Sequence, residues 1–184
     1  MTMNPFQISR LLILCLLALP FQVFSQLGHE GQPLGWNTTW EPSLSWNTFD
    51  ALDLEVLAAE DAVTATMKDA PWRFGIEHEV NWTMDNAGQW SEEEGMRVWR
   101  LAVQAEDATS WSFYLSEFSV PKGGELFVWN GERTDFIGAF NHENQKDWQG
   151  LALSLVEGGQ AVIEYREPLN IPETGSIVVS QVVQ

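Results

Sequence analysis

The sequence predicts an all-β protein: an antiparallel β-sandwich, jelly-roll-like in its organisation, preceded by an extended arm and one short candidate helix. From Trp72 onward, apolar residues recur with a period of two, which is typical of strands that bury one face. Turn-forming pairs such as Asn130-Gly131 and Gly158-Gly159 separate these runs. Helical periodicity does not occur between the runs, so we expect antiparallel sheets rather than parallel strands joined by crossover helices.

Residues 1–25 are predicted to be a secretory signal peptide. Arg10 supplies a positive charge, residues 11–19 form a short apolar run, and Pro20 ends it before a cleavage site expected after Ser25. The run is too short to span a membrane. We therefore expect a secreted protein, extracellular or periplasmic, with no membrane span after the signal is removed.

Residues 26–70 are predicted to form an extended, Trp-rich arm and connector, and residues 71–184 the sandwich domain. The arm is rich in Gly, Pro, Ser and Asn and keeps no strand or helix period. We expect its tryptophans to pack against the sandwich, because burying a large aromatic side chain is worth about 2 kcal/mol or more. The alternative is a platform for a sugar ring. These tryptophans are Trp36, Trp40 and Trp46.

Residues 50–67 are the one plausible helix. Leu54, Leu57 and Asp61 follow helical spacing, and the acidic residues early in the segment suit a helix N-terminus. The alternative is an extended connector that ends in a turn at Pro71. The predicted strands, in chain order, cover residues 73–81, 96–104, 110–120, 126–129, 136–140, 150–155, 161–166 and 176–183.

The strand expected over residues 96–104 has one apolar face, formed by Trp99, Leu101 and Val103, which should point to the core. Arg100 lies on the other face.

Cations are scarce in this chain, so we expect Arg97 and Arg100 to be structural. Each should be partly buried beside Trp99 with an ion pair or a cation–π contact. Trp72 and Arg73 are assigned structural roles as well.

The composition excludes several classes of protein. The 184 residues include 26 acidic and 9 basic ones, and the formal net charge is −17. A surface this acidic does not suit nucleic acid or an anionic membrane, whereas it suits cationic partners. The single cysteine, Cys15, lies in the predicted signal peptide, which excludes a disulfide scaffold and thiol chemistry in the mature protein.

No motif for catalysis or for a cofactor is found in the sequence. The three histidines are isolated from one another, and neither a Gly-x-Ser-x-Gly elbow nor a phosphate-binding glycine loop occurs. The carboxylate run Glu92, Glu93 and Glu94 is interpreted as a solvated hairpin tip, since adjacent carboxylates do not provide the opposed geometry of a glycosidase. We expect a non-catalytic chain without a cofactor.

The loop of residues 141–147 contains several side chains with oxygen atoms, the type of ligand that calcium prefers. Its spacing matches no twelve-residue calcium loop, and Asn-rich turns commonly form without an ion. We therefore assign no metal, and keep as the weak calcium candidates Asn141, Glu143, Asn144 and Asp147.

Six tryptophans are candidates for contact with a partner, because an aromatic ring can anchor a protein or stack on a sugar. They are Trp36, Trp40, Trp46, Trp111, Trp129 and Trp148.

Several segments, taken in order, form one pattern. They are Glu60-Asp61, Trp72-Arg73-Phe74-Gly75, Arg97 to Leu101, the Phe-x-Val-Pro-x-Gly-Gly-x-Leu-Phe-Val stretch at Phe118 to Val128, Gly138-Ala139-Phe140, and Gly159 through Glu164-Tyr165 to Pro168. The pattern resembles the N-terminal region of secreted trypsin-like serine endopeptidases of the lysyl endopeptidase type, which are common in Bacteroidota. The resemblance covers residues 55–183.

The resemblance implies a pro-region or accessory domain, which in that family lies between the signal peptide and the catalytic domain. Neither the Thr-Ala-Ala-His-Cys context of the catalytic histidine nor the Gly-Asp-Ser-Gly-Gly context of the serine occurs here. No catalytic residue is carried over, so the chain is expected to be a fragment of a longer protease precursor or a stand-alone relative.

Two functions from different classes follow. As an accessory domain, the chain would bury an apolar surface against a trypsin-like protease domain downstream in the same polypeptide. As a stand-alone module, it would bind a glycan or a cell-surface protein. A contiguous exposed apolar patch favours the first function, and exposed tryptophans in a line on one face favour the second.

Overall fold

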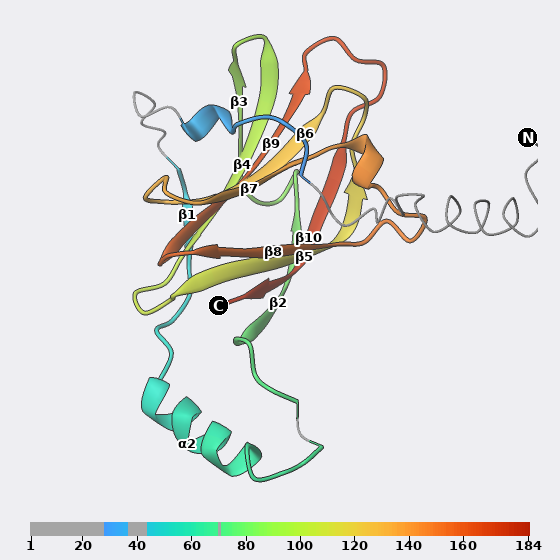
Figure 1. Cartoon of the computed structure of the whole chain (residues 1–184). Helices are drawn as coiled ribbons and strands as arrows, with labels where there is room; N and C mark the ends of the chain where they lie inside the picture. Colours follow the sequence, from blue (N-terminus) through green and yellow to red (C-terminus); the bar gives the residue numbers. More distant parts are fainter. Residues whose placement is uncertain (1–27, 37–43, 70) are drawn as a thin grey trace, which may run out of the picture.

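The computed structural model describes residues 28–36, 44–69 and 71–184, and the structural statements below concern these residues. The signal peptide expected over residues 1–25 lies outside them, and so does Trp40. The described chain forms two packed β-sheets, with one α-helix that projects away from both (Figure 1).

Sheet A is the sheet that the arm contacts, and its strand order is β1-β4-β9-β6-β7. Strand β3 pairs with the same edge of β4 as β1 does. The strands of sheet A are β1 (Trp46–Thr48), β3 (Gln89–Glu93), β4 (Met96–Gln104), β6 (Glu125–Asn130), β7 (Phe136–Phe140) and β9 (Gln160–Pro168). Sheet B has the order β2-β10-β5-β8. Its strands are β2 (Glu77–Thr83), β5 (Ser110–Ser119), β8 (Leu151–Glu157) and β10 (Ser176–Val183). The helices are η1 (Leu34–Trp36), α2 (Leu54–Thr64) and η2 (His142–Asn144).

The strand order is that of a jelly roll. Apart from β1 and β3, the sheets run β4-β9-β6-β7 and β2-β10-β5-β8, so early and late strands alternate as they do in two Greek keys. Among the described strands, all pairings are antiparallel except that of β1 with β4. The predicted all-β sandwich is confirmed.

The hydrophobic core lies between the two sheets. The apolar face of β4, which the two-residue period predicts, points into it. Trp99, Leu101 and Val103 are fully buried there, and Trp111 and Tyr165 join them from sheets B and A. A fully buried aromatic side chain contributes about 2 kcal/mol or more, so these rings supply much of the stability.

The predicted strands are found, and two further ones add to them. The expected ranges 96–104, 136–140 and 176–183 coincide with β4, β7 and β10. The strands β1 and β3 were not expected, because neither alternates between apolar and polar residues. Strand β1 hydrogen-bonds this part of the arm into sheet A through its pairing with β4.

Helix α2 confirms the helix expected within residues 50–67. The side chain of Asp53 caps it, accepting hydrogen bonds from the backbone N–H groups of Glu55 at 3.2 Å and Val56 at 3.1 Å. None of its residues is buried, so α2 forms without packing on the core.

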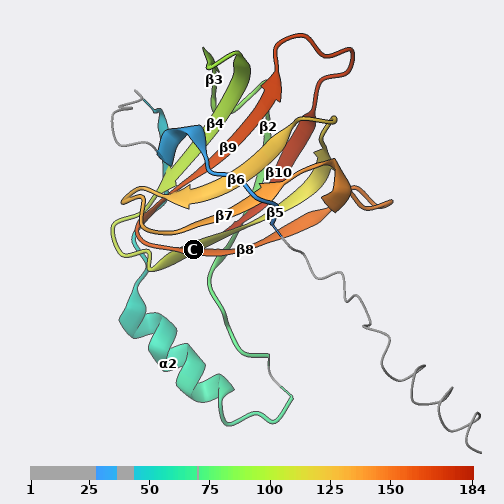
Figure 2. The same ribbon diagram turned by 45° about the horizontal axis from the view of Figure 1, so that its top comes forward.

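The segment that carries α2, residues 51–75, leaves and re-enters the sandwich at one place, and we call it the α2 excursion. The backbone of Ile76 exchanges two hydrogen bonds with Gln184, at 2.9 and 3.0 Å. The side-chain amide of Gln184 donates to the carbonyl oxygen of Asp50 at 3.4 Å. The excursion is therefore an insertion with a closed base, and Figures 1 and 2 show its helix projecting away from the two sheets.

Candidate functional site

The described parts of the arm, residues 28–36 and 44–48, lie along the outer face of sheet A and at its edge, away from the core (Figure 2). At the β7 edge, His29 and Ala139 exchange backbone hydrogen bonds of 2.8 and 3.2 Å. At the opposite edge, β1 pairs with β4. Between them η1 lies so close to the sheet that a Cβ on Gly35 would stand 2.7 Å from Cζ2 of Trp129. Glycine is needed there because any side chain would collide with the sheet.

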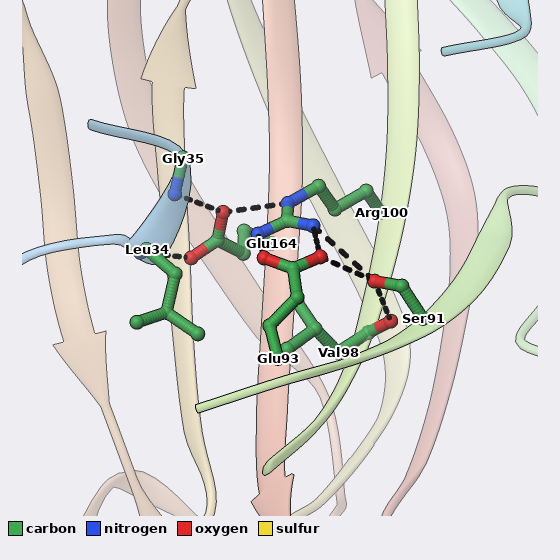
Figure 3. A network of polar contacts seen from close by, with 7 residues as sticks. All are labelled: Leu34, Gly35, Ser91, Glu93, Val98, Arg100 and Glu164. Carbon is green, nitrogen blue, oxygen red and sulfur yellow. Dashed lines mark hydrogen bonds and ion pairs between the residues drawn. The ribbon is translucent and has the colours of Figure 1, made fainter. Parts of the chain in front are cut away.

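A buried ionic network fixes η1 to the sheet (Figure 3). The guanidinium of Arg100 donates from Nε to Oε2 of Glu164 at 2.8 Å and from Nη2 to Oε2 of Glu93 at 2.9 Å. The backbone N–H groups of Leu34 and Gly35 also donate to the Glu164 carboxylate. Arg100 is 3% exposed and Glu164 is fully buried. One arginine thus holds two carboxylates and, through Glu164, the arm.

The network favours the ionised form of Glu93. Burial of Glu93 acts to raise its pKa, but the hydrogen bonds from Arg100 and Ser91, with the charge of Arg100, act in the other direction, and the net pKa is lowered. Glu164 accepts from two backbone amides and a guanidinium. Its lone pairs are engaged by structural donors, so we interpret the network as a clamp rather than as acid–base machinery.

Glu93 corrects the expectation that the whole run Glu92 to Glu94 is a solvated tip. The turn exists, with Glu94 at φ 49° and Gly95 at φ 79° between β3 and β4. Glu92 and Glu94 are exposed, but the pairing of β3 with β4 puts the Glu93 side chain on the same face as Arg100. Side chains alternate between the two faces of a strand, so position in β3, and not the charge of the run, decides that Glu93 is the glutamate that faces Arg100.

Glu167 is a second fully buried carboxylate on β9. Its Oε2 accepts from the hydroxyl of Tyr165 at 2.7 Å and from the N–H of Gly175 at 2.8 Å, and its Oε1 lies 3.2 Å from Nη1 of Arg97. Burial, followed by the hydrogen bond and charge of Glu167, raises the pKa of Tyr165 well above its usual 10.0.

Among the residues expected to be structural, the arginines form ion pairs, whereas Trp72 does not pack in the core. Arg97 and Arg100 have the expected ion pairs, although the ring that lies 4.3 Å from the Arg97 guanidinium belongs to Trp90 and not to the buried Trp99. Arg73 pairs with Glu60 and Asp61, which ties the end of the α2 excursion to its helix. Trp72 is a correction: it is 83% exposed and so does not support the core.

Most of the candidate interaction tryptophans are packing residues. Trp111 and Trp129 are buried, and Trp36 and Trp46 pack half-buried against the cluster around Trp129. The arm tryptophans that the structure describes therefore anchor the arm. Trp148 differs, since it is 71% exposed.

The loop of weak calcium candidates is occupied by its own backbone. Asn141 accepts from the N–H of Glu143, and Asn144 accepts from the N–H of Asn141, which forms a capping box around η2. Glu143 points to His29, 3.7 Å away. Asn141 and Asn144 thus serve as caps of a turn, and the weak calcium interpretation of this loop stays a prediction. Within the described ranges, no group of three or more His, Cys, Asp or Glu is placed to hold a metal ion.

The exposed apolar side chains gather on the α2 excursion, which the sequence analysis did not single out. Those that are at least half exposed there are Leu54, Val56, Val63, Met67, Trp72 and Phe74, the last at 96%. The signal was present in the sequence, because the apolar residues of residues 50–67 do not form a single helical stripe that could face a core. The excursion is the candidate protein-contact surface of this chain.

No protein-family model matches the chain, and no solved structure matches it. In the part of the chain that the structure describes, none of the helices combines the length and apolar character that crossing a membrane requires.

Proposed function

We propose that this chain is a non-catalytic, secreted accessory domain that docks on a partner protein through the α2 excursion. The partner of this proposal is a trypsin-like serine endopeptidase domain, in accord with the resemblance of residues 55–183 to the N-terminal region of such precursors. One observation carries the proposal: six large apolar side chains, each at least half exposed, stand on one insertion, whereas on the sandwich only Trp148 and Leu155 among the described residues reach that exposure. So many large apolar side chains exposed on one short segment are typical of a protein interface.

The charges of the excursion define the chemistry of the partner. Residues 53–74 contain five Asp or Glu and two Lys or Arg. Arg73 is already paired with Glu60 and Asp61, so the excursion presents an acidic surface around its apolar residues. Charge complementarity therefore favours an apolar surface with a basic rim on the partner.

The anatomy of the excursion also supports docking. Its base is closed at Gln184, and α2 buries no residue against the sandwich, so a partner can cover it without disturbing the core. Burial of Trp72 and Phe74 would each stabilise a complex by about 2 kcal/mol before the cost of association.

A non-catalytic role is supported by the way buried charges are used. Glu164 and Glu167, the fully buried carboxylates, accept from arginines, backbone amides and a tyrosine hydroxyl. Each serves the packing of sheet A.

The experiment starts from the genome. The locus is sequenced past the codon of Gln184, and an in-frame trypsin-like domain is expressed separately from this chain. We expect the two purified polypeptides to co-elute in size-exclusion chromatography, and we expect the chain to change the rate at which the protease hydrolyses a lysyl peptide substrate.

Matched variants then locate the contact. The double variant Trp72→Ala/Phe74→Ala should weaken the complex at least tenfold, whereas Trp148→Ala removes another exposed tryptophan outside the excursion and should leave the complex intact. A complex that is indifferent to the double variant would refute docking through the excursion. A stop codon directly after Gln184 would remove the protease partner from the proposal.

The second candidate is a stand-alone binding module for a glycan or a cell-surface component. One observation favours a glycan: Trp148 is 71% exposed on a defined turn, far more than the packed tryptophans of the arm.

A further inference from the structure

We propose that the outer face of sheet B, beside the start of β8 where Trp148 lies, is a binding site for a neutral polysaccharide. This inference is independent of docking through the α2 excursion, because it concerns other residues on another surface.

Trp148 is held on a short, hydrogen-bonded turn. The backbone N–H of Gln149 donates to the carbonyl of Lys146 at 2.8 Å, and the carbonyl of Gln149 accepts from the N–H of Phe118, also at 2.8 Å. Gln149 has φ 60°, which turns the chain sharply into Gly150. The exposed indole is thus presented from a fixed backbone, so little conformational entropy is lost when a ligand stacks on it.

Tyr114 is the second aromatic residue of the site. It belongs to β5, where Phe113 and Leu115 point into the core, so its own side chain stands on the outer face and is 40% exposed. Both aromatic side chains approach Gly150: a Cβ there would lie 2.8 Å from the Tyr114 hydroxyl and 3.1 Å from Cδ1 of Trp148. The missing side chain of Gly150 is what allows the two aromatics to lie next to one another.

The strand register places polar and small residues in a row beside this pair. Tyr114 is opposite Ala152 on β8 and opposite Gln181 on β10, and Gln181 is opposite Glu79 on β2. The row crosses all four strands: the Gln181 amide, which donates to Oε2 of Glu77 at 2.9 Å, lies next to Tyr114, and the Glu79 carboxylate lies one strand further on. Stacking surfaces combined with hydrogen-bonding side chains suit a pyranose ring, which has apolar C–H faces and a rim of hydroxyls.

The charge of sheet B decides which sugars fit. All four of its strands lie within the described residues, and none of them contains a lysine or an arginine. Exposed Glu77 and Glu79 add negative charge. Beside Trp148 the exposed Lys146 and Asp147 carry opposite charges, and the strands add only negative charge, so a neutral hexose polymer fits this face better than a uronate or sulfated sugar.

The test is affinity electrophoresis of the full secreted chain in native gels that contain one soluble polysaccharide each. The neutral probes are mixed-linkage β-glucan, xyloglucan, galactomannan and dextran; the charged probes are alginate and chitosan. We expect at least one neutral polymer to retard the chain and alginate to have no effect. Retardation by none of the neutral polymers, or by chitosan alone, would overturn the proposal.

Variants locate the site. Trp148→Ala and Tyr114→Ala should each weaken retardation at least tenfold, and Tyr114→Phe, which keeps the ring, should weaken it less. Trp72→Ala is the matched control and should migrate as the wild-type chain does in every gel. Binding that survives Trp148→Ala, in a variant whose circular dichroism and thermal unfolding are unchanged, would refute this location. Loss of binding in Trp72→Ala alone would assign the sugar to the α2 excursion instead.

Discussion

Nε of Arg100 lies 2.8 Å from Oε2 of Glu164, and both side chains are buried on the face of sheet A that the arm covers. The two residues are 64 positions apart in the sequence. Their pair is the point at which the arm, β3, β4 and β9 are joined, since Glu93 and the amides of Leu34 and Gly35 bind the same two groups.

Replacing Arg100 by methionine should destabilise the fold strongly. The variant leaves two carboxylates without their cation, and breaking a buried pair from one side typically costs about 3–5 kcal/mol. The measurement is the free energy of unfolding from urea titration. Arg73→Met breaks an exposed pair and should change this free energy only slightly. The double variant Arg100→Met/Glu164→Gln should recover part of the loss; no recovery would contradict the coupling inferred here.

The clamp should make stability depend on pH on the acid side. The pKa of Glu93 is lowered in the folded state, so its ionised form contributes stability above its ordinary value of about 4.5, and this contribution is lost as the pH falls through the lowered folded-state value. Glu93→Gln should therefore be less stable than wild type by about 1 kcal/mol at neutral pH. The difference should shrink once the pH is well below 4.5. A difference that stays constant across this range would show that the charge of Glu93 is immaterial.

Tyr165 should resist ionisation as long as the protein is folded. Its raised pKa means that the folded state favours the neutral phenol, so its contribution to stability is lost as the pH rises above the ordinary value of 10.0. The chain has two tyrosines. Ultraviolet titration should detect fewer tyrosinates in the folded protein than in urea. Tyr165→Phe should leave the amplitude of the folded protein unchanged, and a smaller folded-state amplitude in that variant would be the contrary result.

Gly35→Ala should release the arm from sheet A. The added Cβ would stand 2.7 Å from Cζ2 of Trp129 and 2.9 Å from Oε2 of Glu164, so η1 must move and the amide donors to Glu164 move with it. Hydrogen exchange of Leu34 and residue 35 reports the release, and it should become at least tenfold faster. Gln32→Ala changes an exposed arm residue and should leave the exchange as it is.

Removing the α2 excursion should leave the sandwich folded. Asp50 and Ile76 both contact Gln184, so a short Gly-Ser linker in place of residues 53–74 can join the two ends. Because α2 buries no residue, we expect the free energy of unfolding to change by less than about 1 kcal/mol. Loss of the cooperative transition in urea would show that the excursion belongs to the folding unit.

Local pattern predicted much of the architecture. The two-residue period of residues 96–104 identifies both the strand β4 and the side of it that faces the core, because side chains in a strand alternate strictly. The tight turn at Gly158-Gly159 was also predicted, and Gly158 has φ 120°. The connection that the turn makes was not predicted. Strand β8 lies in sheet B and β9 in sheet A, so the chain passes from one sheet to the other there instead of closing a hairpin.

The exposed surfaces needed the tertiary structure. Trp148 and Trp129 look alike as candidates in the sequence, yet one is 71% exposed and the other 2%. The difference arises because the arm covers Trp129, while Trp148 stands on a turn beside Gly150. Whether each tryptophan is covered is not encoded within a few residues of it in the sequence.

The sequence by itself determined the all-β class, the core face of β4, a helix within residues 50–67 and the acidic charge, since each depends on spacing or composition within a short segment. Only the tertiary structure decided that Glu93 and Glu164 meet at Arg100, that the described parts of the arm lie along sheet A, and that the α2 excursion and the Trp148 surface remain uncovered. Those outcomes depend on residues that are distant in the chain and are brought together by the order of strands in the two sheets, which periodicity along one strand cannot specify.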